Sequence, residues 1–247
     1  MAMKKQLIAL LFLPVLFCSC THYYYVPNTQ NVPLFREKNE YRVTIATGAG
    51  DESTCTEVQT AYSVTDKIGV MANFMTAKGV NSSSNNSAKG NFLEAAVGYY
   101  KPVEKAGVFE VYGGIGGGNQ YHEYPDSGSS ALSSLRLFVQ PSYGFTFNPV
   151  DIAFSTRLSA LSFVSIDNHI YGNPVLHDEV NSLSHQTHLL IEPALTVRAG
   201  WKNVKLQLQF LYVGYLNSKD LNIGEETHLS LGLNIAIAKR YRKNFPE

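Results

Sequence analysis

The feature that most constrains this chain is an alternation of apolar with small or polar residues, which recurs from Tyr41 onward. In residues 203–215, one side of the pattern is Val204, Leu206, Leu208, Phe210 and Tyr212, and the other is Lys205, Gln207 and Gln209. Similar segments occur at residues 92–100, 108–116, 135–147, 189–198 and 227–238. Successive residues of a β-strand point to opposite faces, so a period of two predicts strands with one apolar and one polar face. We expect an all-β chain of about ten strands.

Composition indicates which face meets the surroundings. Charged residues make up 16% of the chain, below the roughly 25% of ordinary soluble domains. The polar positions of the strands are mainly Gly, Ala, Ser, Thr, Asn and Gln, which suit a crowded interior better than a water-facing surface. We therefore predict a single closed antiparallel up-and-down transmembrane β-barrel with apolar faces toward lipid. Aromatic residues near segment ends resemble an interfacial girdle: Tyr99, Tyr100, Phe147, Trp201, Tyr212 and Tyr241.

The connections between segments alternate in length. Tight connections are expected on the periplasmic side, near residues 65–67, 102–106, 148–151 and 201–203. Longer polar connections are expected on the outside, at residues 79–90, 119–130, 165–186 and 217–226, while the first outer connection, near residues 50–53, is short. An even strand count places both ends of the barrel on the periplasmic side.

Two prolines interrupt this strand pattern. Pro141 and Pro193 fall in mid-strand positions, where each removes a backbone donor from the ladder. We expect local bulges or bends at both. The glycine run Gly113–Gly118 has neither the Lys nor the following helix of a phosphate loop, and it indicates a flexible strand end or a tight part of the lumen.

The N-terminus has the pattern of an export signal. Lys4 and Lys5 precede the apolar stretch Leu7–Phe17, which is too short to span a membrane. Ser19 and Cys20 resemble the cleavage site of a bacterial lipobox, with Cys20 as the lipid carrier. Of the three cysteines, only Cys55 then remains besides the acylated one, which excludes an internal disulfide framework.

These features predict four regions. Residues 1–19 form a lipoprotein signal peptide, residues 20–40 a lipid anchor and periplasmic linker, residues 41–241 the barrel, and residues 242–247 a periplasmic tail. Basic and acidic residues are balanced at 20 each, so losing Lys4 and Lys5 leaves 18 against 20 and a formal charge of −2. This balance argues against a nucleic-acid partner.

Several segments resemble a known family. The N-terminal residues 25–28 and 31–40, the hairpin 61–71 and the strand 94–100 are similar to lipid-anchored outer-membrane β-barrel proteins of the Bacteroidota type. This resemblance implies a barrel in the envelope of a Gram-negative cell. It implies no catalytic residue.

Charged residues on the polar faces are the main candidate site. Because alternate residues of a strand share one face, the following charged residues are expected to point into the lumen: Arg136, Arg157, Arg198, Lys205, Glu94, Glu110 and Glu192, together with Arg42 and Glu57. Both signs occur in similar numbers, so the charges are expected to pair and plug a narrow barrel. The alternative is a charged constriction for a small polar solute.

The remaining candidates carry weaker signals. The histidines at 122, 169, 177, 185, 188 and 228 fall in or beside expected outer loops without a metal-ligand spacing, and we expect no metal and no cofactor. His228 and Ser230 have the spacing of outer-membrane lipid A deacylases, but their parity points them inward, away from lipid. We therefore expect no catalytic residue and no enzyme.

Three functions remain compatible with this pattern. The leading hypothesis is a non-enzymatic outer-membrane barrel lipoprotein, in contact with outer-membrane lipid, that has a structural role or meets an extracellular ligand or envelope partner through its outer loops. The alternatives are a narrow pore for small solutes and a soluble, lipid-anchored barrel that binds a hydrophobic ligand.

Overall fold

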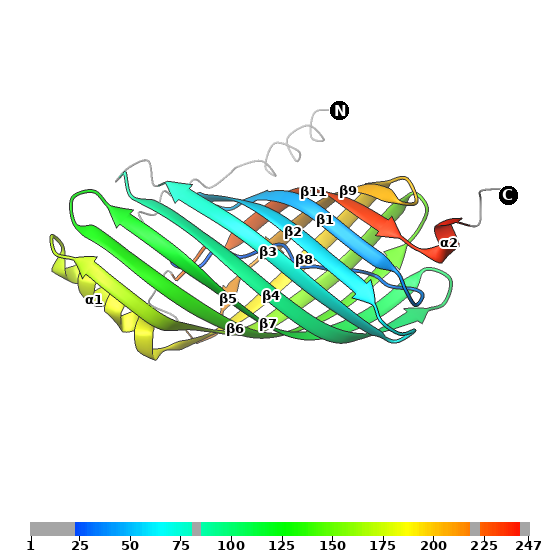
Figure 1. Cartoon of the computed structure of the whole chain (residues 1–247), viewed down its shortest axis with the longest axis horizontal. Coiled ribbons are helices and arrows are strands. Elements are labelled where there is room, and N and C mark those ends of the chain that lie inside the picture. Colours follow the sequence, from blue (N-terminus) through cyan, green and yellow to red (C-terminus); the bar gives the residue numbers. More distant parts are fainter. Residues whose placement is uncertain (1–22, 81–84, 218–222, 243–247) are drawn as a thin grey trace, which may run out of the picture.

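The computed structural model describes residues 23–80, 85–217 and 223–242, and it forms a closed antiparallel β-barrel (Figure 1). The strands are β1 (Tyr41–Ala49), β2 (Ser53–Ser63), β3 (Ile68–Val80), β4 (Ser87–Val103), β5 (Gly107–Tyr124), β6 (Gly128–Thr146), β7 (Val150–Ile170), β8 (Thr187–Gly200), β9 (Val204–Tyr212), β10 (Gly214–Tyr215) and β11 (Thr227–Ile237). Strand β10 has only 2 residues and pairs with β8, which leaves ten long strands among the eleven.

Closure is complete around the barrel. Strand β1 pairs with both β2 and β11, and β9 pairs with both β11 and β8, so no long strand is left with an unpaired edge. A closed ladder satisfies the backbone polar groups without help from solvent, which is the condition for β-structure in hydrocarbon. The predicted all-β class and the barrel of about ten strands are confirmed.

The two ends of the barrel differ. The end with the tight turns after β2, β4, β6 and β8 also carries helix α2 (Lys239–Arg242), and we call it the turn end (Figure 1). The opposite end, which we call the loop end, carries helix α1 (Pro174–Ser182) and the short 3-10 helix η2 (Leu183–His185). Asn173 caps α1 by accepting a hydrogen bond from Leu176 N, and Pro174 occupies its first turn.

The strands β4 to β7 are longer than expected, with 17, 18, 19 and 21 residues. About 9–11 residues suffice to cross a bilayer, so this wall extends beyond the other strands at the loop end. Residues 119–130, expected as a loop, are therefore mostly strand, with only 125–127 between β5 and β6. Alternation is weaker there because outward positions of the extension, such as Lys89, Asn91 and Asn119, are polar.

The outer surface of the barrel is apolar, and the lumen is polar. The side chains that point outward include Ile45, Leu93, Val97, Ile115, Leu137, Val139, Phe154, Leu158, Leu195, Leu206, Phe210, Leu231 and Leu233. On the extended wall, the outward positions become polar toward the loop end, at Lys89, Asn91, Asn119 and Ser133. This distribution is the reverse of a soluble protein and matches a transmembrane barrel. Among the described residues, no helix is long and apolar enough to cross a membrane.

The turn end carries exposed aromatic side chains. Trp201 is 80% exposed, and Tyr41 stacks on Tyr62 with ring centroids 4.4 Å apart. Tyr100 was expected in this girdle but is fully buried, because it lies next to outward-facing Tyr99 and therefore points inward.

We expected bulges or bends at Pro141 and Pro193, and the strand register shows no bulge at either residue. The β6–β7 ladder lacks pairs at Gln140 and Pro141, but its register is unchanged on both sides of the gap. Similarly, β8 lacks pairs with β9 and β10 at Glu192 and Pro193, which lie opposite Val213 and Tyr212, while β9 and β10 keep the same register against β8. The register shift of β6–β7 lies instead between Ser133 and Ser134. A missing donor thus opens the ladder locally without inserting a residue.

The apolar outer band predicts a position-dependent effect of charge. Leu208 lies on the outer face between Val197 and Leu231, and Leu208→Arg should lower the free energy of unfolding by about 2–4 kcal/mol in lipid vesicles. Asn119→Arg, on the polar outer face of the extended wall, is the control and should change it by about 0–1 kcal/mol. Denaturant titration followed by the fluorescence of Trp201 measures both. Equal effects at the two positions would contradict a lipid-facing band.

Candidate functional site: a plug inside the barrel

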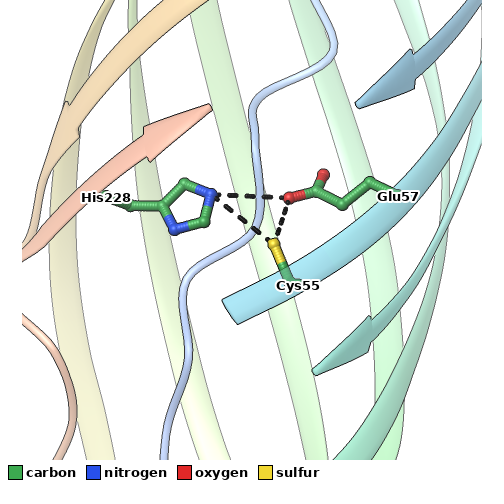
Figure 2. A group of neighbouring side chains, drawn as sticks. All are labelled: Cys55, Glu57 and His228. Carbon is green, nitrogen blue, oxygen red and sulfur yellow. Dashed lines mark hydrogen bonds and ion pairs between the residues drawn. The ribbon is translucent and has the colours of Figure 1, made fainter. Parts of the chain in front are cut away.

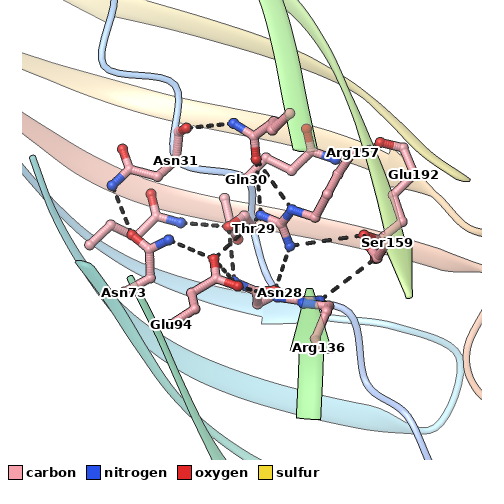
Figure 3. Close-up of polar contacts among 12 residues, drawn as sticks. Asn28, Thr29, Gln30, Asn31, Asn73, Glu94, Arg136, Arg157, Ser159 and Glu192 are labelled. Atoms are coloured by element: carbon pink, nitrogen blue, oxygen red, sulfur yellow. Dashed lines mark hydrogen bonds and ion pairs between the residues drawn. The ribbon is translucent and has the colours of Figure 1, made fainter. Parts of the chain in front are cut away.

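An N-terminal segment fills the lumen. Residues 24–35, which we call the plug segment, run between the strands from the loop end toward the turn end (Figures 1 and 3). At the loop end, Tyr24 N donates to Ile223 O at 2.7 Å and Tyr25 forms a parallel bridge with Gly224. Residues 27–35 are all buried. Residues 20–40 were predicted to be a lipid anchor and periplasmic linker; within that range the structure places residues 24–35 in the lumen, and Cys20 lies outside the described residues.

The sequence of the plug segment suits a chain that lacks a neighbouring strand. Pro27 and Pro33 fix an extended backbone and carry no N–H that would need a partner. Between them, residues 28–31 are Asn, Thr, Gln and Asn, whose side chains both donate and accept. The wall strands already pair with one another, so lumen side chains supply hydrogen bonds to the plug backbone, while Gln30 Nε2 and Asn31 Nδ2 donate to wall carbonyls of Glu192 and Thr60.

Glutamine and glutamate side chains of the wall supply those bonds. Thr29 donates to Glu57 from both its backbone N, at 3.0 Å, and its Oγ1, at 2.9 Å, while Gln59 Nε2 donates to Thr29 O at 2.7 Å. Gln30 N donates to Gln209 Oε1 at 2.6 Å, and Gln209 Nε2 returns a bond to Gln30 O at 2.9 Å. The Gln209 carboxamide thus replaces a neighbouring backbone for this residue.

The second half of the segment is held in the same way. Arg198 Nη2 donates to Val32 O at 2.7 Å, and Phe35 N donates to Glu110 Oε1 at 3.1 Å. Apolar contacts fill the space between these bonds. Phe35 packs with Ala61, Met71, Ala96, Tyr100, Tyr112 and Phe138, and Val32 and Leu34 pack with Val108 and Ala153.

Four of the predicted lumen charges surround Asn28. Its Oδ1 accepts from Arg136 Nη2 at 2.6 Å and from Arg157 Nη1 at 2.8 Å, and its Nδ2 donates to Glu94 Oε1 at 3.1 Å (Figure 3). Glu94 forms an ion pair with Arg136 and lies 3.5 Å from Arg157, and Glu192 lies 4.0 Å from each arginine. Two cations and two anions thus cancel in a fully buried cluster, which offsets part of their desolvation penalty.

Tyr25 joins the plug segment to the same cluster. Its hydroxyl donates to Glu192 Oε1 at 2.6 Å and accepts from Arg136. Gly116 makes room for the Phe92 ring, because a Cβ there would lie 2.7 Å from that ring, which in turn lies 4.6 Å from Arg136 Cζ. The glycine run therefore marks a tight part of the lumen.

The other predicted charges lie elsewhere in the lumen. Arg198 bonds to Gln207 Oε1 at 2.7 Å in addition to Val32, and Lys205 lies 2.7 Å from Asp151 at the turn end. The structure therefore brings together Glu94, Arg136, Arg157 and Glu192 and places Arg198, Lys205 and Glu110 apart from them. Asn28, Thr29, Gln30 and Asn31 were missed as site residues, although a polar run between two prolines was a usable signal.

A second ion-pair group closes the turn end. Glu40, just before β1, is 2.7 Å from Arg42 and contacts Arg240 of α2 at 2.5 Å and 2.7 Å through its two oxygens. Burial favours a higher pKa for Glu40, but these two guanidinium groups outweigh it and hold its pKa below the ordinary value. The start of β1 is thereby tied to the end of β11.

The histidines divide into two groups. His169 and His177 are exposed beside Asp167 and Asp178, as expected for outer loops. His122, His188 and His228 are buried in the lumen, which corrects the expectation of solvated loop residues. For His122 and His188 the reason is that β5 and β8 extend further than predicted, whereas His228 lies within the predicted strand 227–238, where the alternation already points it inward. Ser230 also points inward, and its Oγ makes no hydrogen bond within the described part of the chain.

Comparisons with known proteins give only general resemblance. No protein-family model and no curated protein matches the sequence. Among solved structures, a KdgM porin aligns with TM-score 0.38 and 11% identity over 80% of this chain and 99% of its own. The translocator domain of autotransporter NalP from Neisseria meningitidis gives 0.48 and 9% over 80% and 88%, and the attachment invasion locus protein Ail of Yersinia pestis gives 0.36 and 14% over 81% and 99%. Similarity at this level transfers no activity.

The buried cluster predicts strong coupling between Arg136 and Glu94. Arg136→Met should lower the free energy of unfolding by about 3–5 kcal/mol, because it leaves buried carboxylates without a partner. Adding Glu94→Gln should recover part of that loss, with a coupling energy of about 1–3 kcal/mol. Denaturant unfolding of the single and double variants measures this, and exposed Lys105→Met serves as the neutral control. Strictly additive effects would contradict the cluster.

Proposed function

We propose that this protein is an integral outer-membrane barrel lipoprotein that does not conduct solutes and acts through its loop-end surface, without catalysis. The observation that carries this proposal is the plug segment. It bonds to side chains from β2, β4, β5, β6, β7, β8 and β9 within one narrow lumen. A lumen crossed by an ordered chain leaves no open path for a solute.

The outer surface supports the membrane location. Its large apolar side chains would be costly in water, and the aromatic residues at the turn end match the interfacial girdle of membrane barrels. The same surface disfavours the soluble barrel, which would hide apolar residues and expose polar ones.

The direction of the plug segment supports a position for the proposed lipid anchor at the loop end. Short turns and barrel termini are periplasmic in bacterial barrels, so the loop end faces outward. Tyr24 and Tyr25 are fixed at the loop end, and Cys20 precedes Tyr23 by three residues, or about 10 Å of extended chain. An acylated Cys20 would therefore insert its lipid in the outer leaflet, opposite to the periplasmic anchor that the sequence suggested.

The loop end offers a surface for a partner. Tyr171 is 83% exposed and Val175 is 77% exposed, next to the close contacts of His169 with Asp167 and of His177 with Asp178. Exposed aromatic and aliphatic side chains beside charges are typical of interaction sites. We propose that this face meets the extracellular ligand or envelope partner.

Conductance tests the sealed lumen. Purified protein in planar bilayers should give no conductance steps, whereas a variant lacking residues 24–35 should give them. Heat-modifiable gel migration of both proteins verifies that each is a folded barrel. Steps of similar size from the unmodified protein would show that it is a pore and overturn the proposal.

Labelling of intact cells tests the orientation. A membrane-impermeant maleimide should modify Tyr23→Cys at the loop end in intact cells, and Lys202→Cys at the turn end only after the outer membrane is permeabilised. The unmodified protein is the control, since Cys55 is buried. The opposite labelling pattern would place the N-terminal end of the plug segment in the periplasm.

A further inference from the structure

Three side chains with metal-binding atoms converge in the lumen near the loop end. Cys55 and Glu57 lie on β2, and His228 lies on β11 (Figure 2). Cys55 Sγ is 3.2 Å from Glu57 Oε1 and 3.9 Å from His228 Nε2, and these last two atoms are 3.5 Å apart. All three residues are buried.

The arrangement differs from that of a catalytic relay. In a nucleophile–histidine–carboxylate triad, the carboxylate holds one ring nitrogen while the nucleophile faces the other. Here both Cys55 and Glu57 approach Nε2 of His228, whereas Nδ1 has no hydrogen-bond partner within the described residues. The three atoms therefore face a common point.

The distances between these atoms match a tetrahedral metal site. Zinc bonds of about 2.3 Å to sulfur and about 2.0–2.2 Å to nitrogen and oxygen require ligand atoms about 3.4–3.6 Å apart. The observed separations of 3.2, 3.5 and 3.9 Å bracket that range. Small side-chain adjustments would bring all three within bonding distance of one ion.

Two further features support the site. Thr29 of the plug segment donates two hydrogen bonds to Glu57 Oε1 and so orients the carboxylate. Such outer contacts commonly fix metal ligands. Gly48 on β1 leaves the necessary space, because a Cβ there would lie 2.4 Å from the His228 ring and 2.9 Å from Cys55 Sγ.

Charge and ligand type indicate the class of metal. A thiolate, a carboxylate and a neutral imidazole together carry two negative charges, which a divalent cation neutralises. Sulfur and nitrogen ligands favour transition metals such as zinc over magnesium or calcium.

We propose that Cys55, Glu57 and His228 bind one divalent transition-metal ion of the zinc class. The ion connects β2 to β11, and through Thr29 it also fixes the plug segment. With three protein ligands, a water molecule completes a tetrahedral set. The cysteine, which the sequence left without a role, becomes a ligand.

Cobalt substitution tests the site. The full chain is unfolded in denaturant with a chelator, refolded into detergent with Co²⁺, and freed of excess metal. One equivalent should remain, with thiolate-to-cobalt charge-transfer absorption in the near ultraviolet and the strong visible bands of tetrahedral cobalt, and Zn²⁺ should displace it. Cys55→Ser should lose the charge-transfer band, and His228→Gln should weaken binding by at least tenfold to a hundredfold.

A matched variant and a folding control make the result decisive. Ser230→Ala, two residues from His228 on the same face, should bind cobalt like the unmodified protein. Unheated gel migration identifies folded protein, and if Cys55→Ser fails to fold, His228→Gln carries the comparison. Absence of the charge-transfer band in folded unmodified protein overturns the proposal. So does a band that persists in Cys55→Ser, because it would assign the thiolate to another cysteine.

Discussion

A chain segment buried inside a barrel must find a partner for every backbone N–H and C=O, and this requirement organises the lumen. The wall strands cannot supply those partners, because their own backbone groups are used in the closed ladder. Side chains therefore replace a neighbouring strand. Gln209 pairs with both backbone groups of Gln30, and Glu57 and Gln59 do the same for Thr29. An unsatisfied buried group would cost about 1–3 kcal/mol, so the match between segment and wall selects one position of the segment.

Charge neutrality is the second condition. Arginines and glutamates from different strands meet around Asn28, whose carboxamide accepts from two cations and donates to one anion. Removing a single charged partner leaves the remaining buried charges without an opposite charge in a low-dielectric environment. A pore would use such charges to select ions. Here the charged side chains bond to one another and to the plug segment instead. The same residues that make the lumen polar therefore hold the plug segment in it.

The strands of the barrel wall were predicted well from the sequence, because the alternation within each strand shows which of its faces is apolar. The alternation in β9, from Val204 to Tyr212, needs no knowledge of any other segment. Parity also assigned Arg136 and Glu94 to the interior. It could not indicate which charges meet, because that depends on strand register and on the stagger of a tilted barrel.

The plug segment escaped prediction for a different reason. Residues 24–35 have no periodicity of their own, since the segment is surrounded by wall on all sides and has no outer face. Its polar run resembles a linker, and only the complementary amides on β2, β6 and β9 distinguish it from one. Likewise, the alternation in β11 points His228 inward, but it gives no sign that this side chain lies beside Cys55 of β2. Long-range pairing of this kind is not encoded in local pattern.

Hydrogen exchange over residues 24–35 tests the central claim most directly. If lumen side chains hold this backbone, amides such as Thr29 N, Gln30 N and Phe35 N exchange as slowly as those of the central strands, while those of the exposed turn residues Lys105 and Lys202 exchange at once. Mass spectrometry of the folded barrel in detergent resolves the two regions. Exchange of residues 24–35 at the rate of an unstructured chain would contradict a plugged lumen.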